Sequence, residues 1–244
     1  QRFLMPPPNP ALMKPSQTAV ILLAWLAGLG FWAQAAFGWN FLWLQVVVAV
    51  FLLATLVLLL LDERQPTVEG ANDNASAAGI LLLLAEELKK QPLQNSEVHF
   101  LFTGCEEVGG HGLRAYLEEY QPPAVDSYWI DLELVGAGAL CYATRHGVTY
   151  LSHYKPGPRL LELAGQVAAA HPELEVTGRD MLVFEEVGLL RPRKYEAICL
   201  MGHDEHGNLV NWHRTSDTLE NIEPETLRRA AAFTRALMQK IDAS

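Results

Sequence analysis

Positions 15 to 61 constrain this chain most, because they form a run of 47 residues without Asp, Glu, Lys, Arg or His. The run divides into residues 19–37 and 41–61, which are separated by Gly38, Trp39 and Asn40. A helix rises about 1.5 Å per residue, so each half is about long enough to cross a hydrocarbon layer of about 30 Å. The pattern predicts a transmembrane helical hairpin over residues 19–61.

The alternative reading of this run is a pair of buried helices in a soluble core. Two helices that are apolar on all sides need more cover than the 180 residues from position 65 onward can supply, so the membrane interpretation is favoured. Trp39 and Trp43 flank the expected turn, where amphipathic rings favour the membrane interface. Gln34 and Gln45 are uncharged, and we expect them to pair with each other between the helices.

Both ends of a hairpin emerge on the same side of a membrane. The leader (residues 1–18) and the body (residues 65–244) therefore share a compartment. The leader contains the run Pro-Pro-Pro-Asn-Pro at positions 6–10, which predicts an extended linker. Arg2, Lys14 and Arg64 lie on that side whereas the turn carries no charge, so the positive-inside tendency favours an integral membrane protein with a cytoplasmic body.

The body is acidic, since residues 65–244 contain 26 acidic and 15 basic side chains. A protein that binds duplex nucleic acid is expected to carry the opposite sign, so we expect no nucleic-acid partner. Three cysteines, at positions 105, 141 and 199, are too few and too scattered for a disulfide framework or a thiolate zinc knuckle. They favour a mostly reduced environment.

Helical and strand-like segments alternate along the body. We expect helices at residues 75–90, 112–120, 158–170 and 224–241, and strands at residues 98–103, 128–135, 139–144 and 197–201. Alternation of this kind predicts an α/β layered domain with a mainly parallel sheet. Ligands of such folds bind at the carboxyl ends of strands, and the chain has no glycine-rich phosphate loop.

Carboxylates and one histidine occupy four loop or strand-end positions of the body. They are Asp73, the pair Glu106 and Glu107, the pair Asp131 and Glu133, and His213. Asp, Glu and His supply the oxygen and nitrogen ligands of a catalytic zinc ion, which keeps one position open for water. A further carboxylate beside them could accept that water's proton.

Each of these residues has a simpler role when it is considered alone. Asp73 fits a turn or helix cap, Glu106 and Glu107 fit a solvated pair, and His213 fits a hydrogen-bonded core histidine. An acidic pair directly after an apolar strand is harder to explain in this way. The combination of all four positions favours a metal-dependent enzyme.

Three motifs resemble the zinc-dependent aminopeptidases of the M28 peptidase family. They are Gly-Ala-Asn-Asp-Asn-Ala-Ser at 70–76, followed by a Leu-rich helix; the pair Glu106 and Glu107 with Gly109; and His-Arg-Thr-Ser-Asp-Thr at 213–218. The resemblance runs from about residue 70 to 240. It implies an α/β fold, a helix–sheet–helix layered metallopeptidase domain with a mainly parallel mixed sheet. It also implies zinc and a peptide substrate.

The resemblance assigns a role to each residue of the main motifs. Asp73 would bridge two zinc ions, and Glu107 and His213 would complete the shell of the first. Glu106 would be the general base.

Three further residues are assigned by the same resemblance. The family's remaining carboxylate ligand lies two residues before a Val/Ile-Gly pair, a spacing that fits Glu133 where Asp is usual, with Asp131 as the fallback. Asp217 would orient His213 from outside the metal shell.

The chain also departs from the family pattern. Ala77 stands where a glycine is usual, and residues 1–70 lack the histidine of the family's upstream His-x-Asp motif. Since the sequence starts at Gln1, we expect this motif and the first strands to lie upstream. The complete protein would then hold two zinc ions, whereas this chain would bind at most one tightly. His203 or His206 is the alternative source of the missing ligand.

The leading interpretation is a membrane-anchored zinc metallopeptidase, an aminopeptidase that hydrolyses N-terminal peptide bonds with metal-activated water. One alternative is a one-zinc acyltransferase similar to glutaminyl cyclase, which needs only the Asp, Glu and His ligands. The other is a non-catalytic, receptor-like relative. Such a relative would be expected to have lost its ligands and base together, and this chain retains Asp73, Glu106, Glu107 and His213.

Overall fold

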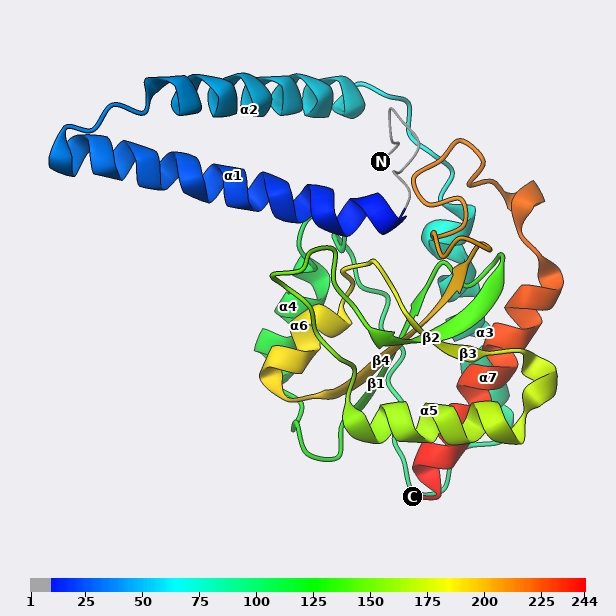
Figure 1. The fold of residues 1–244 in the computed structure, drawn as a ribbon. Coiled ribbons are helices and arrows are strands. Elements are labelled where there is room, and N and C mark those ends of the chain that lie inside the picture. The colour runs from blue at the N-terminus through cyan, green and yellow to red at the C-terminus, as the bar shows by residue number, and fades with distance from the viewer. Residues whose placement is uncertain (1–9) are drawn as a thin grey trace.

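The computed structural model describes residues 10–244 and consists of a helical hairpin and an α/β body (Figure 1). Helix α1 covers Pro10–Phe37 and helix α2 covers Leu42–Glu63. The two helices run antiparallel beside each other and project from the body. The extended linker expected at positions 6–10 lies outside the described residues, apart from Pro10.

The hairpin begins earlier than expected, at Pro10 rather than at residue 19. Residues 10–14 include the good helix formers Ala, Leu, Met and Lys, and the helix continues through Pro15. Thr18 fixes this part of α1 on the body, because its Oγ1 accepts a hydrogen bond of 2.9 Å from the backbone N–H of Tyr150. The end of the predicted leader is therefore helical.

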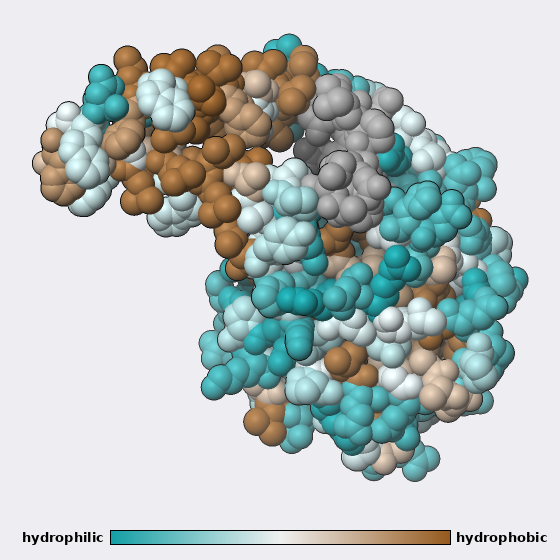
Figure 2. Space-filling view, in the orientation of Figure 1, coloured by the Kyte–Doolittle hydropathy of each residue, from teal (hydrophilic) through white to brown (hydrophobic). Residues whose placement is uncertain are grey.

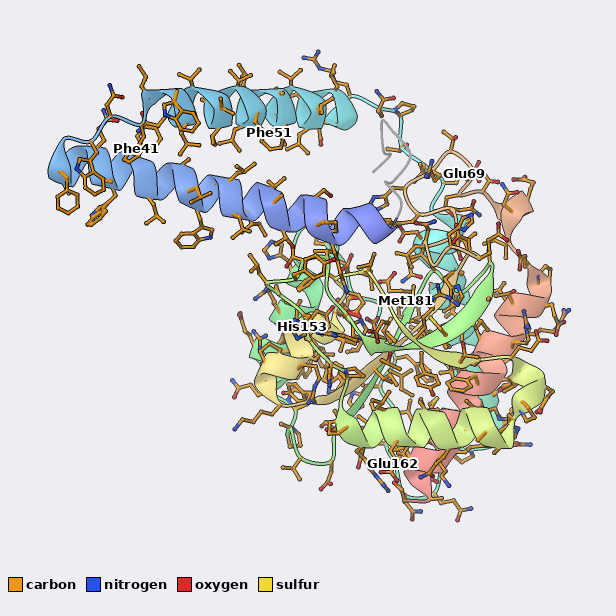
Figure 3. All side chains as sticks on the ribbon, viewed as in Figure 1. Phe41, Phe51, Glu69, His153, Glu162 and Met181 are labelled. Carbon is orange, nitrogen blue, oxygen red and sulfur yellow. The ribbon has the colours of Figure 1, made fainter. Side chains whose placement is uncertain are left out.

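The hairpin carries a continuous apolar surface, shown in brown in Figure 2. Only 17% of the most apolar window of Lys14–Phe37, and 11% of that of Leu42–Leu61, is buried. Figure 3 labels Phe41 at the turn and Phe51 on α2. The expected glutamine pair is confirmed, since Gln45 Nε2 donates to Gln34 Oε1 at 2.9 Å. Both helices are long and apolar enough to cross a membrane.

A four-stranded sheet forms the centre of the body, with strand order β1-β4-β2-β3. The strands are β1 Tyr128–Glu133, β2 Ala139–Arg145, β3 Thr177–Asp180 and β4 Glu196–His203. The pairs β1–β4 and β2–β3 are parallel, and the central pair β2–β4 is antiparallel. The mixed, mostly parallel sheet of an α/β fold is thus confirmed.

Helices cover both faces of the sheet. One face packs against α3 (Ser76–Lys90), α5 (Pro158–Ala170) and α7 (Pro224–Asp242), with Phe233 and Leu84 among its buried residues. The other face packs against α4 (His111–Tyr120) and the short α6 (Val187–Leu190), with Leu113 and Cys199 in its core. Single-turn 3-10 segments lie at Pro172–Leu174, Arg191–Arg193 and Leu219–Asn221. The body therefore has three layers.

The four predicted helices of the body are present, but the prediction of a strand at residues 98–103 is wrong. This segment has no regular secondary structure, because no strand in residues 10–244 pairs with it. Phe100 still packs against the core, whereas Phe102 is 57% exposed. Strand β3 and helix α6 were not predicted, since four-residue elements are too short to show a period.

We expect Phe233→Ala to lower the free energy of unfolding by about 3–5 kcal/mol, because it empties a fully buried site. The ring of Phe233 stacks on Tyr142 with centroids 6.3 Å apart, so the sheet loses a contact as well. Urea denaturation of the whole chain in detergent measures the change. Phe102→Ala is the matched control and should change the value by less than about 0.5 kcal/mol. Equal effects of the two substitutions would contradict this description of the core.

Candidate functional site

The loop that carries Asp73 connects the hairpin to α3. Residues Ala71–Ala75 form one irregular turn, in which the Asp73–Asn74 peptide bond is cis, and Glu69 just before it is labelled in Figure 3. Gly70 has a φ of 75°, and a Cβ atom there would lie 3.0 Å from the carbonyl oxygen of Asp73. A glycine at position 70 therefore allows the chain to turn sharply before Asp73.

Polar side chains attach this loop to the sheet. Asn72 is fully buried, and its Oδ1 accepts a hydrogen bond of 2.7 Å from the N–H of Gly136, just after β1. Asn74 Nδ2 donates to the carbonyl oxygen of Leu132 at 2.8 Å. These bonds hold the loop against the carboxyl end of β1.

Asp217 accepts two hydrogen bonds from the backbone of the Asp73 loop. Its Oδ1 accepts a hydrogen bond of 2.5 Å from the backbone N–H of Asn72, and its Oδ2 accepts one of 3.2 Å from that of Asp73. Asp217 is fully buried. Its carboxylate therefore positions the backbone of Asp73.

Glu106 and Glu107 lie in the turn of residues 106–109, directly before α4. The N–H groups of Gly109 and Gly110 both donate to the carbonyl oxygen of Glu106 at 2.9 Å. The N–H of Gly112 donates to the carbonyl oxygen of Gly104 at 2.9 Å, and a Cβ at Gly112 would lie 2.5 Å from that oxygen. The close backbone approach that fixes the two carboxylates thus requires glycine at position 112.

His213 brings the two loops together. Its ring is buried, and Nε2 lies 2.6 Å from Glu107 Oε1 and 3.4 Å from Asp73 Oδ2. The backbone of His213 has a φ of 52°, in the left-handed region. One ligand atom from each of the three residues lies within 4.8 Å of the others. The structure thus brings Asp73, Glu107 and His213 to one point.

Electrostatic repulsion acts on the carboxyl groups around this point. Burial and then the neighbouring Glu107 carboxylate raise the pKa of Asp73 to about 6. Burial, Glu107 and Glu186 raise the pKa of Glu106 to about 7. The hydrogen bond with His213 holds the pKa of Glu107 below its usual value.

The chemistry of the three converging residues fits a divalent metal ion. Two carboxylates and an imidazole are ligands that zinc accepts. Carboxylates that burial and mutual repulsion disfavour as anions are stabilised by a cation between them. Glu106 is near this group without belonging to it. Asp73, Glu107 and His213 therefore form a candidate metal site with the Glu106 carboxyl group close to it.

Neither carboxylate on β1 belongs to the group of Asp73, Glu107 and His213. Burial, and then Asp131 and Asp73, raise the pKa of Glu133 well above its usual value, so Glu133 is close to the Asp73 loop. Glu133 is nevertheless outside the group of three ligand atoms. Asp131, the fallback ligand, instead groups with Glu185 and Cys199.

Sequence reasoning missed the acidic pair Glu185 and Glu186, which lies just before α6. The charges of both residues contribute to the raised pKa of Glu106. A signal for them exists in the sequence, because the tetrapeptide Glu-Glu-Val-Gly occurs at residues 106–109 and again at residues 185–188. In both copies the acidic pair follows an apolar segment and precedes a helix. The repeat could have identified the second pair as a candidate.

Comparison with protein families gives one match, Peptidase family M28, over residues 59–238. No curated protein sequence matches the chain. The family match covers the whole sheet, the Asp73 loop and most of α7.

Several solved structures are similar in fold. A zinc aminopeptidase from Bacillus subtilis has a TM-score of 0.58 and 22% identity, over 71% of this chain and 43% of that one. LapB from Legionella pneumophila has a TM-score of 0.56 and 13% identity, over 72% and 48% of the two chains. Glutaminyl cyclase from Porphyromonas gingivalis has a TM-score of 0.53 and 21% identity, over 71% and 64%. The chain thus spans less than half of the first two structures, and at these identities the likeness establishes the fold.

The raised carboxyl pKa values predict how the stability of the metal-free protein changes with pH. A carboxyl group whose pKa is higher in the folded state stabilises the fold at low pH, and this contribution is lost as the pH rises through the folded value. The pKa of Glu106 is raised from 4.5 to about 7, and that of Asp73 is raised from 3.8 to about 6. We therefore expect the thermal unfolding midpoint to fall between about pH 4 and pH 7 in the presence of a chelator.

Glu106→Gln should reduce this fall, because glutamine does not ionise. Glu119→Gln, at an exposed position on α4, is the matched control and should leave the fall unchanged. Midpoints measured at half-unit pH steps on the whole chain in detergent give the comparison. A metal-free protein that is equally stable at both ends of the range would contradict the burial of these carboxyl groups.

Proposed function

We propose, from the premise that this chain belongs to peptidase family M28, that it is the membrane-anchored catalytic part of a zinc aminopeptidase. The proposed metal ligands are Asp73, Glu107, His213 and Glu133, and the proposed general base is Glu106. The observation that carries the proposal is the convergence of Asp73, Glu107 and His213 beside a carboxylate that is not part of their group. The sequence motifs predict the same four ligands and the same base.

Zinc at these ligands would polarise the carbonyl group of a peptide and lower the pKa of water. Glu106 has the position and the acidity of a proton carrier, because it is half-buried and its pKa is raised to about 7. Its carboxylate would accept a proton from the attacking water and return it to the leaving amine nitrogen. Asp217 would keep Asp73 in place through the backbone bonds described above.

A substrate with a free N-terminal amine fits the charge of this site. Asp73, Glu106, Glu133 and Glu186 are neighbouring carboxylates, so the site attracts a cationic α-amino group. This attraction favours an exopeptidase that removes N-terminal residues. The family resemblance implies that Asp73 would bridge two zinc ions.

A second candidate is a one-zinc acyltransferase that cyclises N-terminal glutamine. The observation in its favour is that the described residues bring together one Asp, one Glu and one His. The structure of Porphyromonas gingivalis glutaminyl cyclase supports it only through a similar fold. The reaction product distinguishes the two candidates, since a cyclase leaves the peptide chain intact and a peptidase shortens it.

The hairpin is the proposed anchor in a lipid bilayer. Its support is the exposure of large apolar side chains along both helices, among them Trp25, Trp43 and Leu53. The two helices are antiparallel (Figure 1), so the start of α1, the end of α2 and the body lie on the same side of the membrane. Lys14 and Arg64 flank the hairpin on that side, which favours the cytoplasm.

The two adjacent glutamates give a matched test of their roles. Glu106→Gln should keep its zinc content and lower kcat by at least about 10²-fold, because positioned proton transfer contributes about that much. Glu107→Gln should lose zinc, because it removes a ligand. Elemental analysis gives the zinc content of the chain and of both variants. Their activity is assayed with an aminoacyl-anilide and with a peptide that starts with glutamine.

Loss of zinc to the same extent in both variants would show that Glu106 is a ligand instead of a base. Cyclisation of the glutamine peptide without cleavage of the anilide would select the second candidate.

We expect the chain to remain in the membrane pellet after extraction with alkaline carbonate, because helices that span a bilayer are not released by charge repulsion. A variant that lacks residues 14–61 is the control and should appear in the soluble fraction. Mass spectrometry of the pellet should detect peptides from α1 and α2. Release of the unaltered chain by carbonate, or a membrane form from which the hairpin has been cleaved, would rule out the anchor.

A further inference from the structure

A second group of side chains of types that can bind a metal ion lies under the helical layer formed by α4 and α6. Asp131 on β1 and Cys199 on β4 are register partners in the parallel pair of these strands. Glu185 comes from the segment that follows Met181, which is labelled near the centre of the body in Figure 3. One ligand atom from each of the three residues lies within 4.8 Å of the others. The three residues come from three separate segments of the chain and meet inside the core.

The group consists of two buried side chains and the half-buried Asp131, and it is incompletely hydrogen-bonded. Glu185 and Cys199 are 1% and 0% exposed. Among the described residues, the buried Oδ2 of Asp131 has no hydrogen-bond partner, whereas Oε1 of Glu185 contacts His146 Nδ1. A buried carboxylate oxygen without a donor costs about 1–3 kcal/mol or more, so Oδ2 of Asp131 is suited to a ligand that the protein itself does not supply.

Two aromatic side chains hold Glu185 in this position. Tyr154 donates its hydroxyl proton to Glu185 Oε2 at 2.8 Å. His146 is fully buried and stacks on Tyr154, and its Nδ1 is in ion-pair contact with Glu185 Oε1. The carboxylate is therefore oriented before any ligand arrives, as the ligands of a metal site commonly are.

The balance of charge at this place is unfavourable without a cation. Glu186, Glu106 and Glu133 are close enough to interact with Asp131 or Glu185, and among these contacts only His146 can carry a positive charge. Buried carboxylates need a cation or protons. The thiol of Cys199 favours a cation of the zinc class, because thiolates select zinc over magnesium or calcium.

We propose that Asp131, Glu185 and Cys199 form a second zinc site, separate from the one at Asp73, Glu107 and His213. His146 is the fourth side chain in reach, either as a ligand or as the group that orients Glu185. Asp131 lies two residues before Glu133 on β1, a separation of about 7 Å along the strand. It does not depend on the proposed function, because the ion would bind whether or not the chain cleaves peptides.

This zinc ion would connect the sheet to the segment before α6. Glu186, next to Glu185, accepts a hydrogen bond from the side chain of Thr103, and Thr103 precedes the turn that carries Glu106. The ion would thus hold the Glu106 turn through Glu185, Glu186 and Thr103. With this site, the expected number of tightly bound ions in this chain rises from one to two.

Cobalt substitution distinguishes the two sites, because only the proposed site contains sulfur. A thiolate bound to Co²⁺ gives a charge-transfer absorption band in the near ultraviolet, which carboxylates and imidazole do not. The test uses the whole chain with Cys105→Ala, because Cys105 is exposed and adjacent to Glu106. We expect the cobalt-loaded protein to show the band, and Cys199→Ala to abolish it and to lower bound cobalt by one ion per chain.

Cys141→Ala is the matched control, since Cys141 is also a fully buried cysteine in the same core but is outside the group. It should keep the band, and so should His213→Ala, which removes a ligand of the other site. Asp131→Asn, nearly equal in size to the native residue, should weaken the band even if Cys199→Ala fails to fold. A cobalt-loaded protein without the band, or a band that persists in Cys199→Ala, would overturn the proposal.

Discussion

Repulsion among carboxylates is the constraint on which the arrangement of this body depends. Seven acidic side chains lie close enough around strand β1 and its carboxyl end to interact with one another. They are Asp73, Glu106, Glu107, Asp131, Glu133, Glu185 and Glu186. Two histidines, His213 and His146, make ion-pair contacts with members of this set. Such a concentration of like charge in a low-dielectric interior is unfavourable by itself, and divalent cations or bound protons offset it.

The rest of the fold holds these groups together against their repulsion. Two hydrophobic layers, one on each face of the sheet, supply the stabilising burial. Backbone hydrogen bonds then set the position of individual carboxylates: Asp217 holds the Asp73 loop, and the contact between Gly104 and Gly112 holds the Glu106 turn. Since these positions are determined by the backbone, the proposed ligands are held in place by the fold itself.

The apolar hairpin and the interior of the body meet at one loop. Thr18 on α1 accepts a hydrogen bond from Tyr150, and the loop that contains Tyr150 is closed by a β-bridge between His146 and Tyr154. These two residues in turn contact Glu185. The base of the hairpin is therefore joined to the proposed second zinc site through the single loop of residues 146–154. The connection between the hairpin and the core is short.

Local patterns in the sequence determined the hairpin, the helices of the body and the three residues that converge at the first site. The 47 uncharged residues allow few alternatives to apolar helices, and the helical periods of residues 158–170 and 224–241 can be read without knowledge of their neighbours. Only the tertiary structure decided that residues 98–103 remain unpaired and that β2 runs antiparallel to β4. It also decided that Asp131 groups with Cys199 and Glu185, while Glu133 is outside the group of Asp73, Glu107 and His213. The reason is that strand pairing and buried contacts join segments far apart in the chain, whereas hydrophobic period and motif spacing report only on neighbouring residues.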